Sequence, residues 1–159
     1  MLTDKKLKVK TFKGNNNAVL VASLIVGDKN TTIGNLVGDF VILQDNFGHI
    51  IASELAIIKG RNHGFTKAPK VRLCRNLGQI VAEEICLGGL VITPASIKAL
   101  SDETSLEFTK ELKGGRPFKV KLFRKNGICQ VLSELDGKKI TNRVEIAGVQ
   151  EGRSWLILD

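Results

Sequence analysis

The chain has 159 residues, of which 43% are hydrophobic and 25% charged, so it is long enough for one ordinary domain or two small ones and too apolar for wholesale disorder. Its net charge of +8 comes mainly from the first 75 residues, which carry 12 Lys and Arg against 5 Asp and Glu. This asymmetry favours an anionic partner for the first half, the alternative being a solvated basic face that only aids solubility.

The first half alternates between apolar and polar residues, which predicts strands over 8–12, 18–26 and 36–43, and a strand or short helix over 50–58. The apolar run at 18–26 is about half the length that a bilayer span needs, so we interpret it as a buried strand and expect no transmembrane segment. Strands at intervals of about ten residues, separated by polar turns, are typical of a sandwich or small barrel.

Residues 59–75 differ from the rest, because they contain six basic residues and no acid around two glycines and a proline. We interpret this segment as a basic loop between two lobes. The predicted domains are therefore an N-terminal β lobe at 1–60 and a β-barrel lobe at 61–159.

The second half contains the clearest helix start, with Thr93 as N-cap and Pro94 at the first helical position, which predicts one short helix near 94–101. Alternating strands are predicted on either side of it. The predicted fold is mainly β, with a small β-barrel lobe preceded by a smaller β lobe.

The three cysteines, Cys74, Cys86 and Cys129, form no Cys-x-x-Cys pair and have no histidine close by in sequence. We expect reduced thiols that act as small core residues in a cytoplasmic protein, and no zinc site. There is also no P-loop, no dinucleotide fingerprint and no Gly-x-Ser-x-Gly motif. The sequence therefore predicts a protein without a cofactor that is not an enzyme.

Residues 84–89, Glu-Ile-Cys-Leu-Gly-Gly, resemble the second signature of PilZ domains, with Glu84 at the acidic position, Cys86 at the serine position and Gly89 at the glycine. The resemblance extends over about residues 67–150. It implies a small β-barrel that responds to cyclic di-GMP, although no two basic residues within 59–75 have the four-residue spacing of the family's arginine pair.

On this resemblance we predict a non-catalytic regulatory or adaptor module. It would recognise an anionic ligand, such as a cyclic dinucleotide, or a protein partner. The ligand would lie between the basic loop and residues 84–89. The predicted ligand-binding residues are Arg61, Lys67, Lys70, Arg72, Arg75, Glu84, Cys86 and Gly89.

The alternative prediction is a β protein that binds nucleic acid through two acid-free basic stretches, 59–75 and 113–125. Phe65, Phe118 and Phe123 lie among these charges, as stacking platforms for single strands would. Core packing is the favoured alternative for these three phenylalanines, and Phe118 is expected to point inward with Val120 or Leu122.

Overall fold

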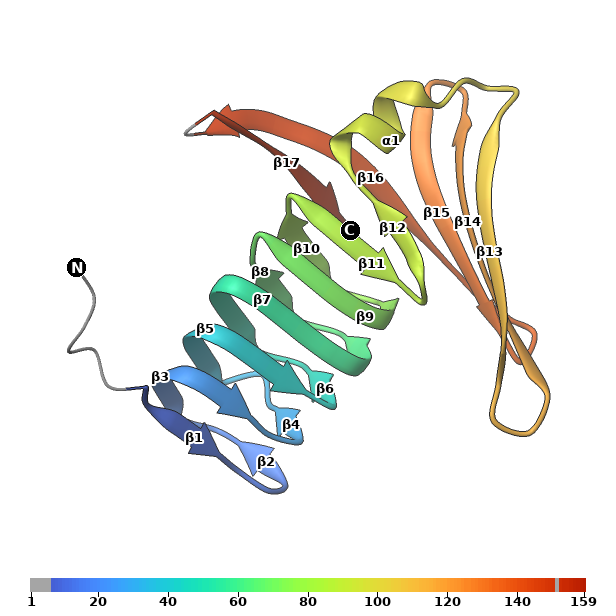
Figure 1. Ribbon diagram of the computed structural model, residues 1–159. Coiled ribbons are helices and arrows are strands. Elements are labelled where there is room, and N and C mark those ends of the chain that lie inside the picture. Colours follow the sequence, from blue (N-terminus) through green and yellow to red (C-terminus); the bar gives the residue numbers. More distant parts are fainter. Residues whose placement is uncertain (1–6, 151) are drawn as a thin grey trace.

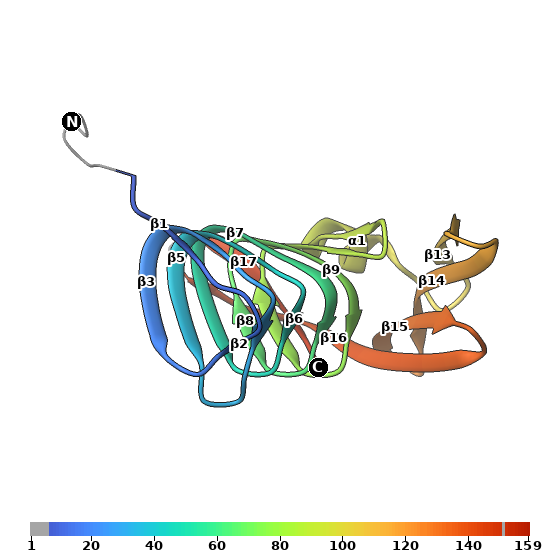
Figure 2. The ribbon, with the colours of Figure 1, turned by 90° about the horizontal axis from the view of Figure 1, so that it is seen from below.

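The structure is a computed structural model that describes residues 7–150 and 152–159. From residue 9 to residue 87 the chain winds as a parallel β-solenoid of about five turns, and an antiparallel sheet follows it (Figure 1). Figure 2 shows the stacked coils, with β1 and β3 at one end and the sheet of β13–β15 at the other.

Each coil of the solenoid has three sides, which we name A, B and C in chain order. Side A contains β1 (Val9–Thr11), the second halves of β3 (Val19–Val26) and β5 (Asn35–Leu43), the middle of β7 (His49–Asn62), most of β9 (Lys70–Asn76), and β11 (Glu84–Leu87). Side B is narrow and contains β2 (Asn15–Asn16), β4 (Lys29–Asn30), β6 (Asp45–Asn46) and the last residues of β7 and β9. Side C contains the first halves of β3, β5 and β7, then β8 (Phe65–Lys67) and β10 (Gln79–Ala82).

The solenoid core forms because every second residue of a strand points inward and the parallel register places equivalent residues of successive coils above one another. On side A the inward column is Ile25, Val41, Ala56, Val71 and Ile85, all of them buried. Stacking such columns buries apolar surface that no coil could bury alone.

Buried asparagines hold side B together as a hydrogen-bonded ladder, formed by Asn16, Asn30, Asn46, Asn62 and Asn76. In each step the amide nitrogen of one asparagine donates to the amide oxygen of the asparagine in the next coil, at 2.9–3.0 Å. Because a buried amide without partners is costly, this ladder lets a polar column run through the interior.

The C-terminal part of the chain closes the solenoid. β12 (Leu90–Ile92) pairs with β11, α1 (Pro94–Ala99) follows, and a meander of β13 (Ser105–Leu112), β14 (Arg116–Lys125), β15 (Ile128–Leu135) and β16 (Lys138–Gln150) leads into β17 (Arg153–Leu158). β17 pairs with β10 on side C. The asparagine ladder ends at this cap, because Asn76 Nδ2 donates to Leu158 O and Asn142 Nδ2 donates to Asn76 O.

The expectation of a mainly β protein is confirmed, and so is the short helix, whose N-cap Thr93 accepts a hydrogen bond from Ser96 N. The predicted β-barrel is wrong: residues 61–87 belong to the solenoid, and residues 90–158 form β12, α1, the meander and its closing strand. β7 (His49–Asn62) continues across residues 60 and 61, the predicted boundary between the two lobes. Alternation predicts strands correctly, but it does not distinguish a parallel coil from an antiparallel barrel.

Candidate functional site

The main candidate site is a groove between side A of the solenoid and β13 of the meander. Its volume is 490 Å³. The side-A wall is formed by Ile57, Arg72 and Cys86, which are in register on three neighbouring strands. The remaining lining residues are Ile58, Lys59, Leu73, Cys74, Gly88, Gly89, Lys110 and Leu112.

The charge of the groove is entirely positive. Lys59, Arg72 and Lys110 line it, and no acidic side chain does. Lys59 and Arg72 come from neighbouring solenoid coils and Lys110 from the facing strand of the meander, so three cations approach one space from two walls. Within residues 7–150 and 152–159, none of the three forms a salt bridge.

Cys74 also lines this groove and is half-buried. Burial raises the pKa of its thiol, and the nearby charges of Lys110, Arg75 and Arg61 only partly oppose that rise. The thiol is therefore protonated at neutral pH and is a weak nucleophile. All three cysteines are free, with Cys129 buried and Cys74 and Cys86 half-buried.

The predicted ligand-binding residues separate onto different sides of the solenoid. Arg72, Cys86 and Gly89 meet in the groove, while Lys70 and Glu84 are neighbours in register further along side A. Arg61 is on side B, and Lys67 is on side C, where its Nζ lies 5.5 Å from the centre of the Trp155 ring. The segment 59–75 is therefore not one loop, because its basic residues are distributed around the coil.

Arg75 is buried between the solenoid and the meander and does not line the groove. It is 2% exposed, and its Nη2 donates to the carbonyl oxygens of Ser133 and Lys138 at 3.2 and 2.9 Å. Burial lowers the pKa of this guanidinium, and the neighbouring Arg61 lowers it further. Arg75 thus connects the solenoid to the meander.

Gly88 and Gly89 shape the end of the groove through their backbone. Both have positive φ, 63° and 118°, in the region that favours glycine. A Cβ at Gly88 would meet the ring of Phe118, and one at Gly89 would meet the ring of Phe108. The two glycines therefore allow the turn into β12 to pack against the meander.

The second basic stretch, 113–125, is largely engaged within the fold. Arg116 pairs with Asp136, Lys119 and Lys121 both approach Glu107, and Arg124 donates to Ile97 O. Of the predicted stacking platforms, Phe118 is fully buried, and Phe65 and Phe123 are half-buried. Phe118 is therefore a core residue.

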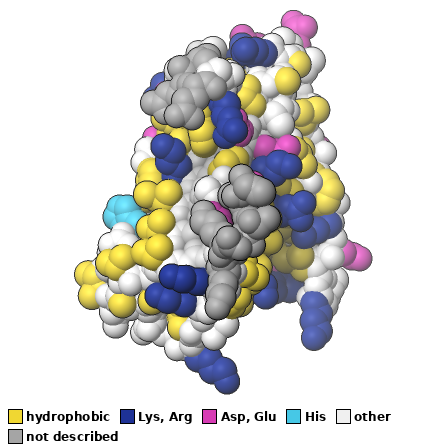
Figure 3. Space-filling view, turned by 60° about the vertical axis from the view of Figure 1, so that its left-hand side comes forward, with side chains coloured by type: hydrophobic (Ala, Val, Ile, Leu, Met, Phe, Trp, Pro, Cys, Tyr) yellow, Lys and Arg dark blue, Asp and Glu magenta, His cyan; other side chains and the backbone are white. Residues whose placement is uncertain are grey.

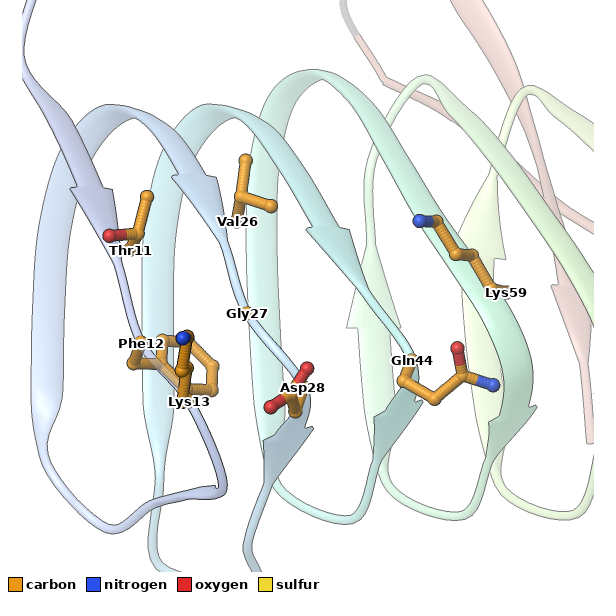
Figure 4. Close-up of a pocket in the computed structure, with 8 residues that line it drawn as sticks. All are labelled: Thr11, Phe12, Lys13, Val26, Gly27, Asp28, Gln44 and Lys59. Carbon is orange, nitrogen blue, oxygen red and sulfur yellow. The ribbon is translucent and has the colours of Figure 1, made fainter.

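A second pocket, of 400 Å³, lies along the same edge of the solenoid and shares Lys59 with the groove. Figure 4 shows Lys13, Asp28, Gln44 and Lys59 on successive coils around it, and the ring of Phe12 beside Gly27. The Phe12 ring occupies the space that a Cβ at Gly27 would fill.

Sequence reasoning missed Lys59 and Lys110 as partners in one site, because they are 51 positions apart and lie on facing walls. It also missed the asparagine ladder, although the motif Asn-x-Gly recurs at 46–48, 62–64 and 76–78. That spacing of 16 and then 14 residues is the coil length.

Among residues 7–150 and 152–159 no cluster of His, Cys, Asp and Glu is suited to holding a metal ion. No helix in the same residues has the length and apolar character to span a membrane. No family model, no curated protein and no solved structure matches the chain, so the PilZ resemblance stays a prediction.

Proposed function

We propose that the protein is a non-catalytic binding module whose groove takes an anionic ligand with an apolar part. The observation that carries the proposal is the convergence of Lys59, Arg72 and Lys110 above an apolar surface that includes Ile57, without an acid in the lining. All three cations are exposed, so each contributes only a salt-screened attraction and the attraction for an anion depends on their convergence in one groove.

Two further observations support a binding role. The raised pKa of Cys74 disfavours a thiolate nucleophile in the groove. A cyclic dinucleotide combines two phosphates with bases whose flat aromatic faces can pack on apolar side chains, so it remains one candidate of the right chemistry. We further propose a cytoplasmic location, on the basis of the three free thiols.

The test is a titration of the protein with cyclic di-GMP and, separately, with the anionic apolar dye 8-anilinonaphthalene-1-sulfonate. Arg72→Glu should weaken binding of at least one of these by tenfold or more, because it places a like charge beside the anion. The matched control is Lys67→Glu, which changes the net charge equally but lies on side C. Equal losses in both variants, or binding of neither probe to the wild type, would refute the proposal.

A second candidate, binding of single-stranded nucleic acid, is favoured by one observation. The groove and the second pocket share Lys59 and follow one edge of the solenoid, with Lys13 at the far end. Affinity for an oligothymidine would then fall steeply with salt, and Lys13→Glu would weaken it as much as Arg72→Glu does. For a ligand confined to the groove, Lys13→Glu would have no effect.

A further inference from the structure

The two ends of the solenoid differ, because residues 7–150 and 152–159 close only one of them. At the C-terminal end, β12 pairs with side A, β17 pairs with side C, and Asn142 with Leu158 O completes side B. At the N-terminal end, β1 and residues 19–22 of β3 are the outermost strands. Among residues 7–150 and 152–159, no strand pairs with the outer edge of residues 19–22.

The outer strands at the open end carry very different side chains. Lys8, Lys10 and Lys13 lie in or beside β1, and lysines on an edge strand oppose pairing with another strand. Residues 19–22, Val-Leu-Val-Ala, carry no charge, and Val19 and Val21 are 64% and 58% exposed. In the space-filling view turned toward this end, hydrophobic side chains form a band along one margin of the molecule (Figure 3).

The backbone hydrogen bonds show which groups of this edge are unpaired. Asn35 N donates to Ala18 O, so the backbone groups of Ala18 point into the solenoid, toward β5. Ser23 N donates to Lys8 O in the opposite direction. Since backbone groups of successive residues in a strand point to opposite edges, the N–H and C=O of Val19 and Val21 point out of the open end.

We propose that two copies of this chain associate head to head by pairing residues 19–22 antiparallel across this edge. In an antiparallel pair, residues directly opposite each other have their side chains on the same face of the sheet. Side chains on the outer face of side C must therefore lie opposite one another, so the two-fold axis passes through either Leu20 or Val21. An axis at Val21 would require Ser23 N to donate to the partner subunit, but Ser23 N already donates to Lys8 O. An axis at Leu20 pairs Val19 with Val21 of the partner subunit, and all four outward groups on each edge find partners.

This arrangement also keeps the lysines of the two copies apart and limits the size of the assembly. A two-fold axis normal to side C exchanges sides A and B, so the lysines beside β1 face the asparagines of the partner's β2 and not the partner's lysines. The interface is isologous, and the opposite end of each copy is already capped. The assembly therefore stops at a dimer and does not grow into a filament.

Sedimentation equilibrium of the full chain over a range of concentrations tests the proposal, and we expect a reversible monomer–dimer equilibrium. Val21→Pro removes an outward N–H that makes no hydrogen bond within the chain, and edge strands tolerate proline at such positions. Two of the four intersubunit hydrogen bonds would be lost, so the dimer dissociation constant should rise by at least about tenfold. The matched control, Val21→Thr, keeps the donor and the β-branched shape and should keep the dimer.

Val21→Lys provides a second variant if the proline variant does not fold, and it should also yield a monomer with wild-type circular dichroism. A wild-type chain that is monomeric at all concentrations would overturn the proposal. So would a dimer that Val21→Pro and Val21→Lys leave intact. A dimer that forms only after residues 1–6 are deleted would show that those residues, and not a second copy, occupy the edge.

Discussion

Replacing Asn46 by alanine tests whether the asparagine ladder stabilises the solenoid. The Asn46 side chain is fully buried. Its Oδ1 accepts from Asn30 Nδ2 and Gly48 N at 3.0 and 3.1 Å, and its Nδ2 donates to Asn62 Oδ1 at 2.9 Å. Alanine can make none of these bonds.

The magnitude follows from what each partner keeps. Asn30 Nδ2 still has Gly34 O, and Asn62 Oδ1 still accepts from Thr66 Oγ1, so each of these two lost bonds costs about 1 kcal/mol. Gly48 N loses its partner in a buried position, which costs about 1–3 kcal/mol. We therefore expect the free energy of unfolding to fall by about 3–5 kcal/mol, a large part of the total for an ordinary domain.

Urea unfolding followed by far-UV circular dichroism measures this change. Asn16→Ala is the matched control, because Asn16 makes a single ladder bond at the open end and should cost about 1–2 kcal/mol. Equal effects of the two substitutions, or a loss below about 1 kcal/mol for Asn46→Ala, would refute the ladder's role.

Asn46→Asp adds a pH test of the same position. Burial raises the folded-state pKa of an aspartate above the unfolded value of about 3.9, so the destabilisation is greatest at neutral pH. It should diminish as the pH falls toward the unfolded pKa, since the carboxyl is then protonated in both states. A penalty that stays constant between neutral and acidic pH would contradict burial of this side chain.

Three other predictions follow from the fold. Arg75→Ala leaves the carbonyls of Ser133 and Lys138 without their donor and should lower the free energy of unfolding by about 2–4 kcal/mol, with faster hydrogen exchange in β15 and β16; unchanged exchange there would contradict its connecting role. Gly64→Ala should lower the melting temperature, because its Cβ would meet Gly48 O and Phe47 C, whereas Gly148→Ala has open space and should not. Burial and Arg61 lower the pKa of His63, so its contribution to stability is complete above the unfolded pKa of about 6.5 and is lost as the pH falls through the folded value; His63→Gln should remove that component from a pH series of melting temperatures.

Local features of the fold could be predicted from the sequence, because they depend on residues close together in the chain. The helix at Pro94–Ala99 begins where Thr93 can cap it and Pro94 can occupy the first turn. The apolar alternation around Val41 and Phe118 likewise predicts strands. The glycines at 48, 64 and 78 lie at bends between strands, and their spacing of 16 and then 14 residues marks the coil length.

By itself, the sequence determined that this protein is mainly β, has one short capped helix and carries excess positive charge in its first half. Only the tertiary structure decided which of those charges act together. A coil of 14–16 residues with three sides sends Arg61, Lys67 and Arg72 in different directions and buries Arg75, while the meander folds back and brings Lys110 to Lys59. Alternation is a local property with a period of two residues, whereas the side on which a residue lies depends on the length of the whole coil and on pairing with other coils.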